Sequence, residues 1–328
     1  MENQIRIAIA GYGNLGKGVE LSLSKNQDMN LVGIFSRRDP KSVKTLFEET
    51  KVFPIESILE FKDKIDVLIL CGGSKDDLPI QGPEFSKNFN TVDSFDNHAK
   101  ILEYFSSIDK PSKENNRVAL ISVGWDPGMF SINRLLGEAL LPDGQTYTFW
   151  GKGLSQGHSD AIRRVKGVKK GVQYTIPSTE AIAKVRSGIK PKLSTKEKHI
   201  RECYIVLEDG ADAKGVEEEI KNMPNYFAPY DTTVHFISEE EFNKNHTKMP
   251  HGGFVIRSGN SNEEHNQVIE YSLTLDSNPE FTASVLIAYA RAAHRLYKKG
   301  DFGAKTVFDI APGLLSIKPA EELRKELL

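Results

Sequence analysis

Three glycines near the start of the chain have the spacing of a dinucleotide-binding turn. Gly11, Gly13 and Gly16 form the pattern G-x-G-x-x-G. Glycines at this spacing permit a tight turn and a close backbone approach to a pyrophosphate, while the N-terminus of a following helix supplies N–H donors. Without a strand before it and a helix after it, the motif is only a structural glycine turn. The intervening residues are Tyr12, Asn14 and Leu15.

Two arginines stand where the type of nicotinamide cofactor is usually determined. Ser36, Arg37 and Arg38 follow the glycine motif by about 20 residues, at the place where NAD-binding proteins carry an acidic residue. Because guanidinium groups bind phosphate oxygens bidentately, we expect NADP rather than NAD. The alternative is a pair of solvated surface arginines. A further loop after an apolar run is expected to line the same site, and it contains Cys71, Gly72, Gly73 and Ser74.

Polar side chains also gather in four glycine-containing or acidic segments, which are residues 93–98, 124–128, 155–160 and 249–253. Ser155, His158 and Asp160 do not indicate a hydrolase, because no G-x-S-x-G elbow surrounds the serine. We predict instead a glycine-hinged loop that closes over a substrate. His246 and His251 lack the spacing of a zinc site, so no metal is expected.

The first part of the chain alternates between apolar strands and amphipathic helices. This alternation predicts an α/β fold with a Rossmann-type, doubly wound parallel sheet, which binds ligands at the carboxyl ends of its strands. The glycine motif and the arginines directly follow strands, so both fall at that edge. Strands are expected over residues 5–10, 31–35, 65–70, 91–93 and 117–123, helices over 17–26 and 97–106, and an exposed connection over 109–116.

The pattern changes after residue 123. Helix periodicity resumes after residue 129, and strand-like runs separated by Gly, Pro and charged clusters then predict a second α+β domain with a more antiparallel sheet. A long helix is expected over residues 279–298. We therefore predict a cofactor domain over residues 1–123 and a second domain over residues 124–278. The strand-like runs cover residues 147–150, 171–176, 199–207, 232–237 and 267–275, with a short helix at 217–221.

Composition excludes several classes of protein. The 328 residues suggest two domains, since one domain takes about 150 residues. A formal net charge of −2 gives no electrostatic reason to expect a nucleic-acid partner. No apolar run reaches the roughly 18 residues of a membrane span. Two cysteines, Cys71 and Cys203, and an N-terminus without a signal-peptide pattern favour a reducing, cytoplasmic location.

Seven segments together resemble the NADP-dependent meso-diaminopimelate D-dehydrogenase family. They are GYGNLG, FSRR, TVDSFDNH, GWDPGMFSINR, FWGKGLSQGHSDA, MPHGG and NPEFTAS, and the likeness extends over residues 5–312. The resemblance implies reversible oxidative deamination of the D centre of meso-2,6-diaminopimelate in lysine biosynthesis, which yields L-2-amino-6-oxopimelate or tetrahydrodipicolinate and ammonia. It also implies that residues 279–328 complete the cofactor domain. A homodimer is implied through the second domain, with contributions from strands 147–150 and 203–207.

Asp93 and Asp126 are the residues expected to act on the reacting amine. Oxidation of an α-amine requires a carboxylate that positions or deprotonates the ammonium group, and both aspartates follow predicted strands. The resemblance implies that both contact the substrate, with Asp126 as an acid/base group unless a water serves instead. Asp126 has a second interpretation, because Asp followed by Pro at the start of a helix is also an N-cap.

The resemblance implies further substrate contacts in the second domain. Thr175, Arg201 and His251 would hold the distal carboxylate, with Arg201 forming bidentate charge-assisted bonds. From the sequence alone, Arg201 is expected to be a surface strand residue. Other contacts are implied for Trp150, Asp160 and Asn278, although the sequence alone also allows a core tryptophan and a helix-capping asparagine.

Two other functions remain open at this stage. One is another two-domain NADP-dependent reductase of amino-acid biosynthesis, similar to homoserine dehydrogenase or dipicolinate reductase. The other is a non-catalytic NADP-sensing protein, in which Asp93 and Asp126 would have no chemical role. Loss of diaminopimelate turnover on substitution of Arg201 would argue against the other reductases.

Overall fold

The computed structural model describes residues 4–224 and 226–328. The chain forms two compact units, Met1–Ile132 with Pro279–Leu328, and Asn133–Asn278. The chain first passes from one unit to the other inside helix α4 (Met129–Leu140), later than the expected boundary at residue 123. Met129 and Ile132 pack against the core of the first unit, which keeps the first turn of α4 with that unit.

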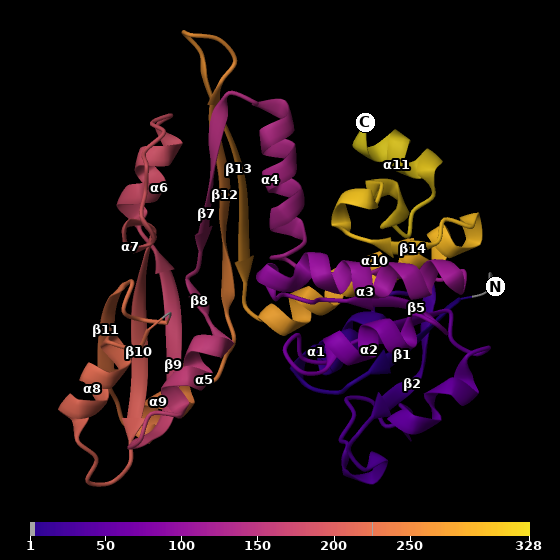
Figure 1. The fold of residues 1–328 in the computed structure, drawn as a ribbon, viewed down its shortest axis with the longest axis horizontal. Helices are drawn as coiled ribbons and strands as arrows, with labels where there is room; N and C mark the ends of the chain where they lie inside the picture. The colour runs from indigo at the N-terminus through magenta and orange to yellow at the C-terminus, as the bar shows by residue number, and fades with distance from the viewer. Residues whose placement is uncertain (1–3, 225) are drawn as a thin grey trace. The chain divides into compact units, whose positions relative to one another are not determined.

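The first unit is built on a seven-stranded parallel sheet (Figure 1). The order β3-β2-β1-β4-β5-β6 is that of doubly wound dinucleotide-binding folds, so the predicted fold class is confirmed. Every neighbouring pair in this sheet is parallel. The strands in spatial order are β14 (Gly303–Lys305), β6 (Val118–Leu120), β5 (Asn90–Asp93), β4 (Val67–Leu70), β1 (Ile5–Ala10), β2 (Met29–Ser36) and β3 (Val52–Pro54).

Helices cover both faces of this sheet, which explains why its central strands are apolar at nearly every position. In β1, Ile7 and Ile9 belong to one core, whereas Ala8 and Ala10 belong to the core on the opposite face. Helices α1 (Asn14–Leu23) and α10 (Asn278–Lys299) supply the first core. Helices α2 (Leu78–Phe85) and α3 (Ile101–Glu114) supply the second. Short 3-10 turns accompany them at η1 (Pro40–Ser42), η2 (Ile55–Phe61) and η3 (His98–Lys100).

Helix α3 occupies the segment that was expected to be an exposed connection. It continues to Glu114 with Pro111 inside it, so the predicted loop over residues 109–116 is wrong. Tyr104, Ile108 and Ser112 are buried at intervals of four residues, which shows that the buried face of the helix continues past the proline. The strand expected over residues 117–123 is shorter, because continuous strand pairing covers only β6 within it.

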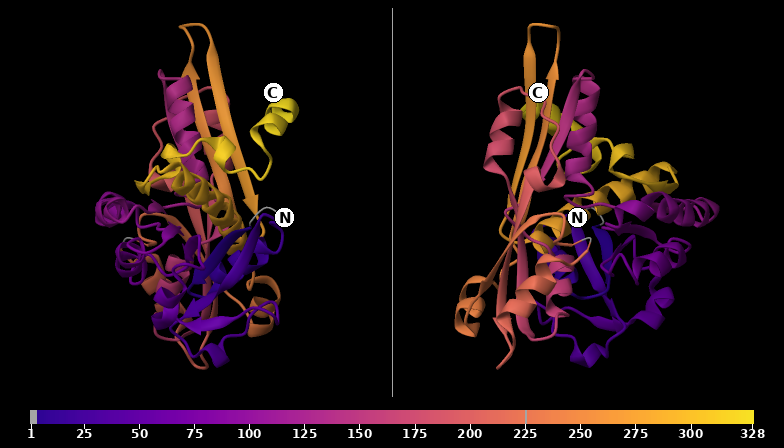
Figure 2. Two further views of the ribbon diagram at one scale, coloured as in Figure 1. Left: turned by 90° about the vertical axis from the view of Figure 1, so that its right-hand side faces the viewer. Right: turned by 60° about the vertical axis from the view of Figure 1, so that its left-hand side comes forward.

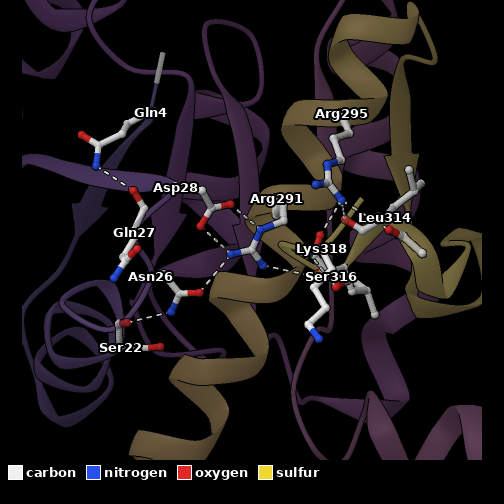
Figure 3. A network of polar contacts seen from close by, with 12 residues as sticks. Gln4, Ser22, Asn26, Gln27, Asp28, Arg291, Arg295, Leu314, Ser316 and Lys318 are labelled. Carbon is white, nitrogen blue, oxygen red and sulfur yellow. Dashed lines mark hydrogen bonds and ion pairs between the residues drawn. The ribbon is translucent and has the colours of Figure 1, made fainter. Parts of the chain in front are cut away.

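Two arginines of α10 attach the C-terminal segment to the first unit (Figure 3). The buried Arg291 donates to both carboxylate oxygens of Asp28, at 2.6 and 2.8 Å, and to the carbonyl of Leu315 at 2.8 Å. Arg295 donates to the carbonyls of Leu314 at 3.0 Å and Ser316 at 2.8 Å. The residues after β14 therefore belong to the first unit, where they form η4 (Val307–Asp309), η5 (Pro312–Leu314) and α11 (Ala320–Leu327).

The second unit contains two further sheets with mainly antiparallel pairing, as predicted. Among the described strand pairs of this unit, only β10–β11 is parallel. Both views of Figure 2 show β12 and β13 as a long hairpin. One sheet has the order β11 (Asp231–Phe236), β10 (His199–Leu207), β9 (Val168–Pro177) and β8 (Gly153–Leu154). The other has the order β13 (Asn266–Leu275), β12 (His251–Asn260) and β7 (Gly144–Trp150).

The segment predicted to be a glycine-hinged loop is a helix, α5 (Gln156–Arg163). The hydroxyl of Ser159 donates to the carbonyl of Ser155 at 2.6 Å and accepts from the backbone N–H of Gln173 at 3.0 Å, which attaches this helix to β9. The loop prediction was therefore wrong. The other helices of this unit are α6 (Thr179–Arg186), α7 (Thr195–Lys198), α8 (Ala213–Lys221) and α9 (Glu239–Asn245). Among the described residues, no helix is both long and apolar enough to cross a bilayer.

Candidate active site

The glycine motif forms the turn between β1 and α1. Gly11 has a φ of +93°, and a Cβ atom on Gly16 would lie 2.5 Å from the carbonyl oxygen of Gly11. At Gly13, by contrast, nothing lies within 4 Å of the Cβ position, and this residue caps α1 without a side-chain hydrogen bond. The turn lies where the strand order reverses between β1 and β4. An accessible backbone at a helix N-terminus that no side chain caps fits the pyrophosphate of a dinucleotide.

A cavity of about 330 Å³ lies beside this turn. It is formed by the loops after β1, β2 and β4, which meet at the carboxyl edge of the sheet. The predicted cofactor residues in its wall are Gly11, Tyr12, Gly13, Ser36, Arg37, Arg38, Cys71 and Gly72. The predicted residues outside its wall are Asn14, Leu15, Gly16, Gly73 and Ser74. Four further wall residues, Phe35, Ile55, Asp77 and Gln81, were not expected from the sequence, the last two because no helix was predicted where α2 lies.

Both arginines of the β2 loop have defined partners. The Nη2 atom of Arg37 lies 2.7 Å from Oδ1 of Asp77. Arg38 donates from its guanidinium to the carbonyl of Tyr12 and from its backbone N–H to the Ser36 hydroxyl at 3.0 Å. These contacts hold two positive charges at the cavity wall, where a ribose 2′-phosphate would find bidentate donors.

Replacing both Arg37 and Arg38 by glutamine is expected to raise the KM for NADPH roughly ten- to a hundredfold, because the two bonds to phosphate, at a solvent-exposed wall, contribute about 0.5–1.5 kcal/mol each. The KM for NADH should change little, since NADH lacks the phosphate. Steady-state kinetics with both cofactors checks this. An unchanged ratio of the two KM values would mean that these arginines do not select the cofactor.

Asp93 is a buried, hydrogen-bonded residue in the core of the first unit. It is 1% exposed, and its carboxylate accepts three hydrogen bonds, from the Tyr104 hydroxyl at 2.7 Å and the backbone N–H groups of Phe95 at 2.9 Å and Ser122 at 3.1 Å. Burial raises the pKa of Asp93 to about 6, although these hydrogen bonds oppose the shift. A carboxylate so enclosed has no exposed edge for a substrate, which argues against the predicted catalytic role.

Because the pKa of Asp93 is raised, the unfolding free energy of the chain should depend on pH. A carboxyl group whose pKa is higher in the folded than in the unfolded chain stabilises the fold below pH ~4 and loses that contribution as the pH rises through about 6. Asp93→Asn has no carboxyl group to titrate, so it does not lose this contribution. The unfolding free energy of the variant minus that of the wild type should therefore be larger at pH 7 than at pH 4 by roughly 2–3 kcal/mol. Urea unfolding at both pH values measures the difference, and parallel pH curves for the two proteins would contradict it.

Asp126 lies in a tight loop at the end of β6. The backbone N–H of Met129 donates to the carbonyl of Gly124 at 2.9 Å, and a Cβ atom on Gly128 would lie 1.8 Å from that same carbonyl oxygen. Only glycine therefore fits at position 128. Helix α4 begins at Met129, so the interpretation of Asp126 as an N-cap followed by Pro127 at N1 is wrong. Asp126 is half-buried, and the loop presents it at the carboxyl edge of the sheet.

Asp96 is a second carboxylate of this edge, which the sequence analysis missed. It is exposed, and its backbone N–H donates to the hydroxyl of Ser74 at 3.1 Å, beside the cofactor loop. Its loop adjoins that of Asp126, because the backbone N–H of Val123 donates to the carbonyl of Asp93 at 2.8 Å. Two aspartates separated by two residues in TVDSFDNH gave no sequence signal to distinguish the buried from the accessible one.

Three predicted substrate residues come together in the second unit. Arg201 on β10 is directly opposite Thr175 on β9, and Thr175 is opposite Gly153 on β8. A Cβ atom on Gly153 would lie 2.4 Å from Cγ of His251, so the imidazole packs directly on the glycine backbone. The strands therefore place Thr175, Arg201 and His251 around one position, and we call these three residues the clamp.

Arg201 is a buried cation rather than the surface residue expected from the strand pattern. It is 6% exposed, it donates to the Thr175 hydroxyl, and its guanidinium carbon lies 3.9 Å from the centre of the Tyr230 ring. Its Nε atom is buried without a hydrogen-bond partner, and burial lowers its pKa. Among the described residues, no Asp or Glu forms an ion pair with it. A buried cation of this kind favours an incoming carboxylate.

Two neutral histidines accompany this cation. Burial, followed by the positive charge of Arg201, lowers the pKa of His158 to about 4 and that of His199 to about 3. The Nδ1 atom of His158 lies 2.8 Å from the Ser155 hydroxyl. Both imidazoles are therefore neutral near pH 7, and neither adds a positive charge beside Arg201. His199 was missed, although its position two residues before Arg201 places it on the same face of the strand.

The remaining predicted substrate residues are placed in different ways. Trp150 is 37% exposed at the end of β7, so it is not a core residue of its unit, and its backbone N–H donates to Nε2 of His199 at 2.9 Å. Asp160 is exposed on α5 and pairs with Arg163. Asn278 is the first residue of α10, and its backbone N–H donates to the carbonyl of Met249 at 2.9 Å.

Comparison with known proteins places this arrangement in one family. Residues 124–277 match the diaminopimelic acid dehydrogenase C-terminal domain. The chain is 64% identical over 326 residues to meso-diaminopimelate D-dehydrogenase of Ureibacillus thermosphaericus, and the match covers 99% of this chain and all of that protein.

Solved structures agree over nearly the whole chain. A sixfold mutant of the Clostridium tetani meso-diaminopimelate dehydrogenase with diaminopimelate has a TM-score of 0.93 and 55% identity. An engineered D-amino acid dehydrogenase bound to NADP⁺ has a TM-score of 0.85 and 46% identity. Each covers 99% of this chain and 100% of its own. The chain therefore belongs to the meso-diaminopimelate D-dehydrogenase family.

Proposed function

We propose that this chain catalyses the reversible, NADP-dependent oxidative deamination of the D centre of meso-2,6-diaminopimelate in lysine biosynthesis. The products are L-2-amino-6-oxopimelate, which cyclises to tetrahydrodipicolinate, and ammonia. The observation that carries the proposal is the clamp, in which buried Arg201 lacks an Asp or Glu partner among the described residues and is joined by Thr175 and His251. A substrate with a carboxylate remote from its reacting amine supplies the missing charge.

The Clostridium tetani structure supports this choice of residues. Its six substitutions replace a Gln, a Thr, an Arg, a Pro, a His and an Asn in a diaminopimelate-bound protein. Residues of the same types occur at the same spacings in this chain. They are Gln156, Thr175, Arg201, Pro250, His251 and Asn278. Four of these six were predicted as substrate contacts, and Gln156 and Pro250 are added to the proposed set.

We assign the reacting amine to Asp126 and Asp96. Asp96 binds and positions the ammonium group at the D centre, and Asp126, or a bound water in its place, removes the proton. Bound NADP⁺ supplies the acceptor for the hydride that leaves the D-centre carbon. Water then adds to the resulting substrate imine, and ammonia leaves, which gives the 2-oxo group. Trp150, Asp160 and Asn278 remain proposed substrate contacts.

NADP is the proposed cofactor because Arg37 and Arg38 line the cavity beside the glycine turn. The engineered D-amino acid dehydrogenase, which shares this fold, binds NADP⁺. The alternative functions lose their basis, because 64% identity over nearly the full chain specifies the dehydrogenase family rather than another reductase or a sensor.

We also propose a homodimer formed through the second unit, in the cytoplasm, where the two free cysteines remain reduced. Most apolar side chains of the strands expected to contribute are buried within their own unit, among them Tyr147, Phe149, Cys203 and Ile205. Leucines of α4 and the strand β13 are better candidates. Their exposed apolar residues are Leu135, Leu136, Leu140, Val268 and Ile269. Light scattering after size exclusion tests the dimer, and a monomeric mass would refute it.

A direct test of the function is NADP⁺ reduction with ammonia release. We expect turnover with meso-diaminopimelate, little with the L,L isomer, and slower turnover with simple D-amino acids that lack the distal carboxylate. Equal rates on all three substrates, or no reaction with any, would overturn the proposal.

A further inference from the structure

Asp77 joins two of the loops that line the cofactor cavity. Its Oδ1 atom lies 2.7 Å from Nη2 of Arg37 on the β2 loop. Its Oδ2 atom accepts a hydrogen bond of 2.9 Å from the backbone N–H of Gly73 on the β4 loop. Both Asp77 and Arg37 belong to the cavity wall. One carboxylate thus connects the predicted phosphate-binding arginine to the loop on the other side of the cavity.

Within this pair, the carboxylate is largely buried and the guanidinium is exposed. The Asp77 side chain is 19% exposed, whereas that of Arg37 is 68% exposed. Asp77 also packs closely on the β4 loop, because a Cβ atom on Gly72 would lie 2.6 Å from the Asp77 Cβ. An exposed arginine has many rotamers, and ordering such a side chain on binding reduces affinity. A fixed carboxylate restricts those rotamers before the ligand arrives.

We propose that Asp77 is a positioning residue for cofactor selectivity, which holds the Arg37 guanidinium at the cavity wall for the 2′-phosphate of NADP. The inference rests on the NADP preference proposed above. Arg38 needs no such residue, because the Tyr12 carbonyl holds its guanidinium. The Asp77 charge also repels a phosphate, but Arg37 neutralises it and solvent screens it, so the ordering effect dominates.

Asp77→Asn tests the proposal with little change of shape, since the amide oxygen still accepts from Gly73 while the charge that holds Arg37 is lost. The matched control is Asp76→Asn, which removes the same charge from the adjacent, exposed position. Fluorescence titration of the full chain with NADPH and with NADH gives both dissociation constants. We expect Asp77→Asn to weaken NADPH binding roughly three- to tenfold and NADH binding hardly at all. Asp76→Asn should change neither.

The same substitution in a protein that already lacks Arg37 separates positioning of Arg37 from any other effect of Asp77 on cofactor binding. In an Arg37→Gln protein, Asp77→Asn should have no further effect on NADPH binding, because the side chain that it positions is gone. Equal weakening of NADPH and NADH, tighter NADPH binding, or an effect that persists without Arg37 would each overturn the inference. A wild-type protein that shows no preference for NADPH would instead remove the cofactor proposal and this inference with it. A preserved wild-type preference that Asp77→Asn leaves unaltered would overturn the inference alone.

Discussion

Arg201→Met lowers kcat/KM for meso-diaminopimelate by roughly 10²–10⁴-fold, which is the largest effect expected of a single substitution in the second unit. Loss of a buried, charge-assisted clamp on a carboxylate costs about 3–5 kcal/mol. Methionine fills a similar volume, and removal of a buried cation without an acidic partner is not expected to destabilise the fold. The KM for NADP⁺ should remain close to that of the wild type, because Arg201 belongs to the unit without the glycine motif.

A matched control is Arg186→Met, which removes an exposed arginine paired with Glu270 in the same unit. This variant should keep its activity within about threefold, as expected for a surface ion pair. Simple D-amino acids provide a second control, since they have no distal carboxylate for Arg201 to bind. Arg201→Met should affect them far less than meso-diaminopimelate. An Arg201→Met protein with nearly full activity on meso-diaminopimelate would remove the clamp from the account.

Asp126→Asn is expected to lower kcat by roughly 10²–10⁴-fold, the range typical of a lost acid/base group. The amide keeps the shape of the side chain in a loop that the Gly124 and Gly128 backbone closes tightly. Asp96→Asn should mainly raise the KM for meso-diaminopimelate, since we assign Asp96 to binding of the ammonium group. Steady-state kinetics of each variant separates the two effects.

Asp93 provides the contrast for this pair of aspartates. Its three hydrogen bonds and complete burial predict that Asp93→Asn acts on the unfolding free energy and its pH dependence rather than on catalysis. If Asp93→Asn lost more kcat than Asp126→Asn, the assignment of the two residues would be reversed.

The first unit could be predicted well from local sequence. The apolar run of β1, the glycines after it and the arginines after β2 are each contiguous signals, and parallel strands place the loops that follow them at one edge. Helix α3 was cut short because Pro111 and its polar neighbours suggested a loop, whereas the buried face at Ile108 and Ser112 maintains the helix.

The arrangement of the second unit could not be predicted in the same way. The burial of Arg201 depends on its pairing with Thr175, which lies 26 positions earlier on the neighbouring strand. The local sequence pattern of either strand does not specify this register. Strand β12 is absent from the strands expected from the sequence, and it begins at His251, Gly252 and Gly253, where both glycines have positive φ. The roles of Asp93 and Asp96 differ only through tertiary burial, which two aspartates in one short motif cannot reveal.

The most direct test of the account follows an isotope from one end of the substrate. Meso-diaminopimelate labelled with deuterium at the D-centre carbon is incubated with the full chain and NADP⁺, and the reduced cofactor is analysed by mass spectrometry. We expect the reduced cofactor to carry the label, whereas substrate labelled at the L centre should leave it unlabelled. Deuterium transfer from the L centre, or equal transfer from both centres, would contradict the account.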